Sequence, residues 1–337
     1  MNKLFFGLPE DDIQEIYHSC INVWPTLENS NLLVMGGTGF VGKWLVATLG
    51  YAQLMGNSVD LTVLSRKPKN EFDLFNSAEF KISWIERDLT KAFKENYEKF
   101  NFIVNAATPS SAQTGAIDPI YVYESIIRGN TAVLSSKNSQ DLRYIYLSSG
   151  AVTQLESVEP FFSQSICLPN HLDNLASAYS HGKRFAETEI ASARESTSLS
   201  AQSLRLYAFA GPGLPLDQHF AAGNFMQDAL KSRFIEINGN PKTQRSYMYP
   251  SDLTKHILQS LVSGDIKTRE VGSTERVSIA ELAKKISENT ENSEVSTGDD
   301  SKTLTSYYPT TEDVLAQTIK LEESIKKWRD WLRLIKT

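Results

Sequence analysis

The chain has 337 residues, of which 41% are hydrophobic, and this is enough for one large core or two smaller ones. Its formal net charge is −6 and it has no basic run, which argues against nucleic acid as a partner. No apolar stretch approaches the roughly 18 residues of a membrane helix, and the first residues lack a signal peptide's basic-then-apolar order, so we expect a cytoplasmic protein with no membrane partner.

The first element expected along the chain is a helix that precedes the main fold. Ile13, Ile16, Tyr17, Cys20 and Ile21 recur at helical spacing. We therefore assign residues 1–30 to an N-terminal helical extension lying on the surface of the domain that follows.

A glycine-rich turn between a strand and a helix is the most informative motif. Residues 31–35 form a short apolar run typical of a buried parallel strand, and helical spacing follows from Val41. In the turn between them, Gly36 permits a tight bend, Gly39 lets the backbone approach a pyrophosphate, and Gly42 lets the helix pack on its strand. The amides and positive end of the helix then face the phosphates, as in a dinucleotide-binding fingerprint. A glycine turn without a ligand is the alternative.

The turn is spaced Gly-x-x-Gly-x-x-Gly and reads GGTGFVG over residues 36–42. This form resembles the short-chain dehydrogenase/reductase superfamily, and it is most similar to the extended branch of NAD(P)-dependent nucleotide-sugar epimerases and dehydratases. The resemblance covers about residues 31–335. It implies that the following residues bind the cofactor: Gly36, Thr38, Gly39, Phe40, Val41 and Gly42.

Further apolar runs at residues 61–64, 81–85, 102–104 and 144–147 are predicted strands, spaced to leave room for crossover helices. We therefore predict an α/β fold, a Rossmann-type doubly wound parallel sheet with a smaller C-terminal substrate-binding lobe. Residues 31–212 are assigned to the NAD(P)-binding domain, 245–262 are expected to return to it, and 213–337 form mainly the lobe. Helices are expected at 251–263, 278–289 and 321–335, and an exposed connection at 290–306.

The end of the second strand of this sheet distinguishes the two nicotinamide cofactors. A carboxylate there receives the ribose of NAD, whereas an arginine accommodates the 2′-phosphate of NADP. This strand ends in Ser65-Arg66, with Lys67 and Lys69 following and no acid at the critical position. Because arginine pairs with phosphate through a planar fork of donors, we expect Ser65 and Arg66 to bind the cofactor and to favour NADP over NAD. A solvated basic turn is the alternative.

The resemblance extends to later parts of the cofactor site. Asp88 and Leu89 match the position where the extended family holds the adenine, although an Asp closing a strand is also common turn chemistry. Ala106 and Ala107 match the family's small-residue turn, which lets the cofactor lie close to the backbone. Asn130 corresponds to an Asn that the family keeps in the next helix, where a polar residue could equally face solvent.

Tyr179 and Lys183 are four residues apart and share one face of a predicted helix. A phenol has an unperturbed pKa near 10, and a nearby lysine cation together with the positively charged nicotinamide favours its ionised form. Ser149, at the end of the strand over 144–147, precedes this helix by 30 residues and aligns with the serine that bonds the reacting sugar oxygen in the family. We therefore expect Ser149, Tyr179 and Lys183 to form the catalytic set, with Tyr179 and Lys183 also contacting the cofactor. His181 should point away from this face.

The resemblance also supplies candidate substrate contacts. Asn224 matches an Asn that commonly bonds the substrate, and Arg245 matches an arginine that contacts the substrate's nucleotide or diphosphate. A structural ion pair is the alternative for Arg245. Two departures matter: Ala208 stands where many members carry a substrate-binding Asn, and Gly150-Ala151 replace the Asp-Glu pair of hexose 4,6-dehydratases. The acid that follows the serine in sugar-acid decarboxylases is absent too.

These observations predict an enzyme acting at C4 of a nucleoside-diphosphate hexose or deoxyhexose, as a 4-epimerase or a 4-ketoreductase, with NADP or NAD as cofactor. A 4,6-dehydratase or decarboxylase is an alternative, and a non-catalytic NAD(P)-binding sensor or partner protein is an alternative of another class. We expect a homodimer. No metal site is suggested by the five scattered histidines or by Cys20 and Cys167.

Overall fold

The computed structural model describes residues 3–66, 80–91, 96–108, 118–135, 142–153, 155–156, 178–218, 220–231, 234–290, 293–302, 304–310 and 312–335. Lys67, Lys69 and Cys167, which the sequence analysis names, lie outside these ranges.

The chain divides into two compact units. The first comprises Met1–Ser149, Leu172–Arg205 and Thr254–Arg269, and the second comprises Gly150–His171, Leu206–Leu253 and Glu270–Thr337. These boundaries are more interleaved than the division at residue 212 expected from the sequence. Only residues 254–262 of the predicted returning segment fall in the first unit, because 245–253 belong to the second.

A central sheet of eight strands has the order β17-β13-β9-β7-β6-β3-β4-β5. The pairs β3–β4, β3–β6, β4–β5, β6–β7 and β13–β17 are parallel. The chain order reverses between β3 and β6, which is the switch point where open α/β sheets bind ligands at their carboxyl edge. The prediction of a doubly wound parallel sheet is confirmed. Its strands are β3 (Ser30–Met35), β4 (Val59–Ser65), β5 (Ile82–Glu86), β6 (Phe102–Asn105), β7 (Arg143–Ser149), β9 (Ser200–Leu206), β13 (Arg269–Gly272) and β17 (Val314–Ala316).

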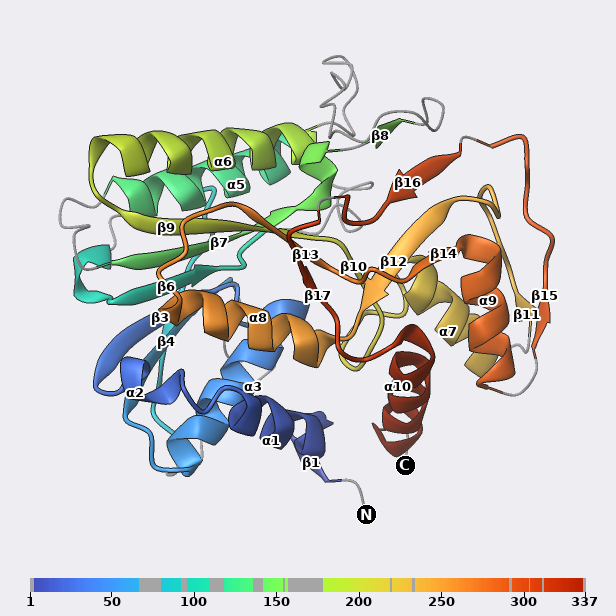
Figure 1. Ribbon diagram of the computed structural model, residues 1–337, viewed down its shortest axis with the longest axis horizontal. Coiled ribbons are helices and arrows are strands. Elements are labelled where there is room, and N and C mark those ends of the chain that lie inside the picture. The colour runs from blue at the N-terminus through green and yellow to red at the C-terminus, as the bar shows by residue number, and fades with distance from the viewer. Residues whose placement is uncertain are drawn as a thin grey trace. The chain divides into compact units, whose positions relative to one another are not determined.

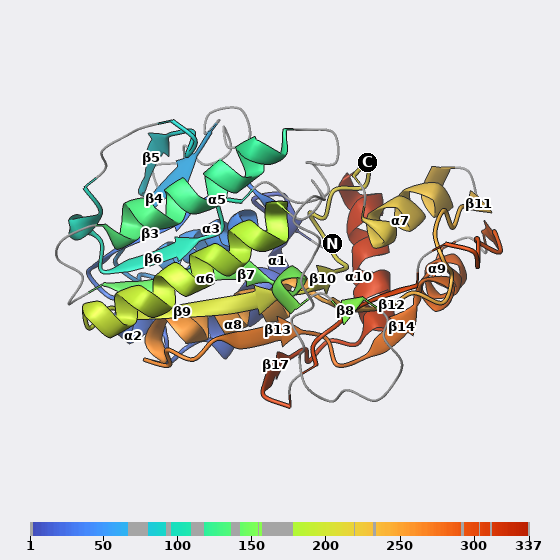
Figure 2. The same cartoon turned by 90° about the horizontal axis from the view of Figure 1, so that it is seen from above.

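Helices cover both faces of the sheet in the first unit. Figure 1 shows α5 (Pro119–Leu134) and α6 (Ala178–Ser196) over one face and α1 (Glu10–Ser19) and α3 (Phe40–Leu54) over the other. Figure 2 shows α5 and α6 side by side. The central strands β3 and β6 are largely apolar because both faces are covered, whereas the edge strand β5 is partly exposed. Leu33, Ile103 and Tyr144 are fully buried between the layers. The remaining elements of this unit are β1 (Leu4–Phe5), β2 (Leu8–Pro9), α2 (Trp24–Leu27), the 3₁₀ helix η2 (Tyr97–Lys99) and the part of α8 (Pro250–Val262) that follows Leu253.

The N-terminal extension forms the predicted helix, α1, but is more firmly embedded than the sequence suggests. Ile13, Ile16 and Cys20 are fully buried, and the indole of Trp24 in α2 donates to the carbonyl of Tyr17 at 2.9 Å. The extension therefore belongs to the core of the first unit.

The second unit is built on a mixed sheet of order β10-β12-β16-β8, with β14 pairing to β12, and on a separate parallel pair, β11–β15. The helices predicted near 278–289 and 321–335 are confirmed as α9 and α10. The predicted exposed connection over 290–306 is partly wrong, because β15 and the start of β16 lie within it. The elements are the 3₁₀ helix η4 (Gly150–Thr153), β8 (Leu155–Glu156), β10 (Ala208–Phe209), α7 (Ala221–Lys231), β11 (Phe234–Ile235), β12 (Gln244–Met248), β14 (Arg276–Ser278), α9 (Ile279–Glu288), β15 (Glu294–Val295), β16 (Thr305–Tyr307) and α10 (Leu321–Ile335).

Candidate active site

The glycine turn joins β3 to α3 at the switch point, and at two of its positions, Gly36 and Gly42, there is no room for a side chain. Gly36 has a φ of +79°, and a Cβ there would lie 2.7 Å from the carbonyl oxygen of Ala106. A Cβ on Gly42 would lie 2.2 Å from the carbonyl oxygen of Gly36, so the first turn of α3 packs directly on the loop. Gly39 differs, because a Cβ there would meet only the Gly36 oxygen, at 3.3 Å. The backbone beside Gly39 is therefore open to a ligand.

The N-terminus of α3 can hold an anion in this open space. Gly39 is the N-cap of the 15-residue helix and no side chain caps it. Phe40 and Val41 open the helix, and the dipole of a long helix favours negative charge at this end. The hydroxyl groups of Thr38 and Ser65 lie 2.6 Å apart, joining the turn to the end of β4. A cradle of this kind fits the pyrophosphate of a dinucleotide.

Arg66 lies just beyond β4 in an exposed position, tied to a second strand end. Its Nη1 donates to the phenol oxygen of Tyr121 at 2.8 Å, and that hydroxyl donates to Asp88 at 3.4 Å. Asp88 also accepts bonds from the amide and hydroxyl of Thr90, at 3.0 and 2.8 Å. Burial alone would raise the pKa of Asp88, but the Thr90 bonds and the Arg66 cation hold it below its ordinary value. The structure thus brings Arg66 and Asp88 together through Tyr121, which sequence reasoning missed.

Three other residues predicted to bind the cofactor lie in different settings. Ala106 follows β6 at the carboxyl edge, beside Gly36, as does Ala107. Leu89 is buried in the core, and a Cβ on Gly129 of α5 would lie 2.7 Å from its Cδ1. Its position is therefore one of packing between the end of β5 and α5.

Asn130 is fully buried and its side chain is engaged on both sides. Its oxygen accepts the Tyr144 hydroxyl at 2.8 Å, and its nitrogen donates to Glu189 at 2.8 Å. Asn105 donates in turn to the Tyr144 oxygen at 2.9 Å. Tyr144 is the second residue of β7, whereas Asn105 is the last residue of β6 and its side-chain oxygen accepts the amide of Ala107 at 3.2 Å, so this network reaches the carboxyl edge through Asn105. The structure excludes a solvent-facing Asn130, and it links this residue through Tyr144 and Asn105 to the turn at Ala107.

Ser149, Tyr179 and Lys183 are brought together at the end of β7. The side chains of Tyr179 and Ser149 are hydrogen-bonded. The ammonium of Lys183, which is 2% exposed, donates to the carbonyl of Leu147 at 2.6 Å and to the Thr108 hydroxyl at 2.9 Å, and its Nζ lies 5.8 Å from the centre of the Tyr179 ring. Serine, phenol and ammonium therefore form a continuous set that could exchange a proton.

Burial governs the protonation of Tyr179 and Lys183. Burial raises the pKa of Tyr179, and the hydrogen bond with Ser149 only partly opposes it. Burial also lowers the pKa of Lys183 to about 7, with Glu187 acting in the opposite direction. Desolvation therefore dominates the pKa of Tyr179 in the protein alone, and the depression expected from Lys183 together with a bound nicotinamide stays a prediction.

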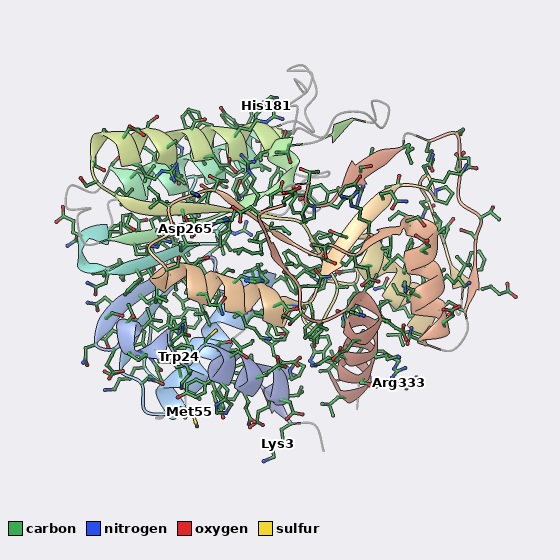
Figure 3. All side chains as sticks on the ribbon, viewed as in Figure 1. Lys3, Trp24, Met55, His181, Asp265 and Arg333 are labelled. Carbon is green, nitrogen blue, oxygen red and sulfur yellow. The ribbon has the colours of Figure 1, made fainter. Side chains whose placement is uncertain are left out.

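Glu187 is a further member of the site that sequence reasoning missed. Its carboxylate accepts the Ser148 hydroxyl at 2.6 Å and the Nε and Nη2 of Arg205 at 3.0 and 2.7 Å. It thereby ties β7, α6 and β9 together next to Ser149. Its place four residues after Lys183, on the same helix face, was the available signal. His181 lies on the outer side of α6, away from the sheet, as expected (Figure 3).

The predicted substrate contacts lie in the second unit. The guanidinium of Arg245 donates to the carbonyl of Gln244 and to the Thr305 hydroxyl, both at 2.9 Å, and lies 5.8 Å from the centre of the Tyr307 ring. Burial lowers the pKa of Arg245, and its hydrogen-bond partners in the described part of the chain are a carbonyl and a hydroxyl, with no carboxylate among them. An ion pair with a described residue therefore does not explain the presence of Arg245.

Asn224 lies in the first turn of α7. In the amide orientation that satisfies both of its polar atoms, its nitrogen donates to the carbonyls of Leu216 and Gln218, at 3.2 and 2.5 Å. Its amide nitrogen therefore holds the segment that precedes α7. Among the residues that the structure describes, no group of His, Cys, Asp and Glu could hold a metal ion, and no helix is long and apolar enough to cross a membrane.

The chain is similar to proteins of known family and structure. A family model described as the NAD dependent epimerase/dehydratase family matches residues 32–271. UDP-glucuronic acid decarboxylase 4 of Arabidopsis thaliana is 23% identical over 265 residues, a match that covers 76% of this chain and 56% of that protein. The chain thus spans little more than half the length of that relative.

Two solved structures share the fold. An epimerase from Methanothermobacter thermautotrophicus is 19% identical with a TM-score of 0.75, covering 95% of this chain and 98% of the other. A UDP-glucose 4-epimerase from Thermotoga maritima, solved with UDP-glucose, is 18% identical with a TM-score of 0.73, covering 91% and 100%.

Proposed function

Because the chain belongs to the NAD-dependent epimerase/dehydratase family, we propose that it catalyses hydride transfer at C4 of a nucleoside-diphosphate hexose or deoxyhexose, as a 4-epimerase or a 4-ketoreductase. The observation that carries the proposal is the joined set of Ser149, Tyr179 and Lys183 at the carboxyl edge of the sheet. A non-catalytic sensor would have no need of a buried ammonium held beside a hydrogen-bonded phenol and serine.

The residues of the chain have separate tasks in this reaction. A bound nicotinamide supplies the site that accepts or donates hydride. The Ser149 hydroxyl orients the C4 oxygen, and Tyr179 takes the proton from that oxygen or returns it. Lys183, anchored by the Leu147 carbonyl, stabilises the phenolate when it forms.

The cofactor would be held by the glycine turn and by the ends of β4 and β5. The open backbone at Gly39 and the uncapped start of α3 suit a pyrophosphate. We propose NADP as the preferred cofactor, since Arg66 is an exposed arginine at the end of β4. NAD is the alternative, and Asp88, bonded through Tyr121 to that arginine, is the nearby acid that would favour it.

Dehydratase and decarboxylase activities are the second candidates, because the family includes dehydratases and the curated relative is named a decarboxylase. Both need an acid in the turn after the serine, where this chain has Gly150-Ala151. We therefore place C4 chemistry first. The sugar-nucleotide contacts of Asn224 and Arg245, the homodimer and the cytoplasmic location belong to the same proposal.

A panel of nucleoside-diphosphate hexoses and their 4-keto forms, incubated with NADP, NAD and their reduced forms, tests this function. We expect interconversion at C4. A ketoreductase changes the absorbance at the nicotinamide band and the mass by two hydrogens, whereas an epimerase returns the hydride, so its product of equal mass is followed by NMR or by chromatographic separation of the epimers. Tyr179→Phe should keep its fold and cofactor binding and lose roughly 100-fold or more of the turnover. Cofactor binding without turnover on any substrate would favour the sensor, and normal turnover by folded Tyr179→Phe would show that another group moves the proton.

A further inference from the structure

Gly150, the residue that follows Ser149, is a glycine because of space. It does not have a positive φ, so its backbone conformation is open to other residues. A Cβ at this position would instead lie 2.3 Å from Cε1 of the Tyr207 ring and 2.7 Å from its Cδ1 and Cζ. Separations under 3 Å between such atoms are not tolerated, so any side chain at position 150 requires the ring to move.

The Tyr207 ring is held from several directions within the second unit. Its hydroxyl donates to Glu270 Oε1 at 2.6 Å, and the other carboxylate oxygen of Glu270 accepts the amide of Thr310 at 2.8 Å. The rings of Tyr207 and Tyr307 are 5.0 Å apart. Tyr207 is 5% exposed and Glu270 is 3% exposed. A buried carboxylate that accepts hydrogen bonds from a phenol and a backbone amide is costly to displace, so the Tyr207 ring is held beside Gly150.

The protonation of Tyr207 is set by its surroundings. Burial and the neighbouring carboxylate of Glu270 both raise the pKa of Tyr207, and the Thr153 hydroxyl only partly opposes them. The phenol therefore stays neutral and donates to Glu270. The small cavity beside it is lined by Gly150, Thr153, Tyr207 and residues of the 306–310 segment, and none of the described lining residues is a carboxylic acid or a cation.

We infer that Tyr207, held in place by Glu270, is a specificity-determining residue that occupies the place of one of the two acids needed for elimination. The inference rests on the proposed function. Elimination of water across C5 and C6 requires one group to take the C5 proton and another to protonate the departing C6 hydroxyl. Because the ring leaves no room for an acid at position 150, the residues of the site support only proton and hydride exchange at C4.

The packing claim can be tested without a substrate. Gly150→Ala should lower Tm by several degrees, because overpacking a closed core is destabilising. The same change in a Tyr207→Ala background should cost little, since the ring is gone. Gly239→Ala is the matched control, because nothing lies within 4 Å of a Cβ there, and its Tm should move by about a degree or less. Equal losses for Gly150→Ala in both backgrounds would overturn the inference.

The specificity claim needs a second variant pair. The two acids of the dehydratases are introduced by Gly150→Asp with Ala151→Glu. One variant keeps Tyr207, and a second also carries Tyr207→Ala. In deuterium oxide, with cofactor and the 4-keto sugar that the panel identifies, we expect deuterium at C5 only when the ring has been removed. Incorporation by the wild type, or none in the variant lacking the ring, would overturn the role of Tyr207. If the panel finds no substrate but the Tm coupling is present, the proposed function fails while the packing of Tyr207 on Gly150 stands.

Discussion

Glu187→Gln is the substitution whose effect the structure specifies most closely. The carboxylate ties the Ser148 hydroxyl to the Arg205 guanidinium, and the two charged side chains are 13% and 27% exposed. Glutamine keeps the size and one acceptor oxygen but removes the negative charge. The partly buried Arg205 guanidinium thereby loses its carboxylate, and Ser148 and Arg205 are left with one acceptor oxygen in place of two.

The size of the effect follows from burial. Exposed ion pairs contribute about 0–1 kcal/mol, whereas removing one partner of a buried pair costs about 3–5 kcal/mol. This pair lies between the two limits, so we expect a loss of about 2–3 kcal/mol in the free energy of unfolding. For a cooperative unit of 150–250 residues, that corresponds to a Tm lower by roughly 4–12 °C.

Urea unfolding and a thermal scan measure this loss, and Glu124→Gln is the matched control. Glu124 pairs with Arg128 on α5, where the two side chains are 40% and 49% exposed, so the control should lose about 0.5 kcal/mol or less. Similar losses for the two variants would refute the reasoning from burial.

A second measurement separates a positioning role from simple packing. Glu187 raises the pKa of Lys183 against the effect of burial, which brings that pKa down to about 7. In the described surroundings of the ammonium the other titratable groups are Tyr146 and Tyr179, whose rings it faces. Glu187→Gln should therefore move the titration of Lys183 to lower pH, as followed by NMR of ¹³C-labelled lysine. An unchanged midpoint would contradict the coupling.

Three other predictions concern binding and pH. Arg66→Ala should weaken NADP binding by roughly 10-fold or more, the scale of one charged hydrogen bond, and leave NAD binding within a few-fold; equal losses by calorimetry would refute the NADP assignment. Between pH 7 and about 10.4 an unfolded chain keeps the Lys183 proton that the folded protein has lost, so the free energy of unfolding should rise with pH. Lys183→Met should flatten this rise when urea unfolding is measured at pH 7 and pH 9. Parallel pH profiles for the wild type and the variant would contradict the low pKa of Lys183. Arg245→Ala should weaken binding of UDP by roughly 10-fold, and unchanged affinity would remove Arg245 from the substrate site.

Local sequence patterns were sufficient for the main elements of the fold. The apolar run of β3, the glycine turn and the periodicity of α3 are neighbours in the chain, so their arrangement follows from backbone geometry. The same holds for Tyr179 and Lys183, which share a helix face because they are four residues apart. The parallel sheet followed from strands alternating with room for crossover helices, and it is confirmed.

Contacts between distant segments were decided only by the tertiary structure. Glu187 meets Ser148 and Arg205 because α6, β7 and β9 pack together, and no periodicity pairs those residues. Similarly, the sequence shows only that position 150 lacks an acid, whereas the structure shows that the Tyr207 ring occupies the space of a side chain there. The pKa of Tyr179 also depended on folding, since desolvation is set by what packs around a group. Periodicity in sequence reports which residues share a face of one element, whereas burial and pairing depend on which other elements cover that face.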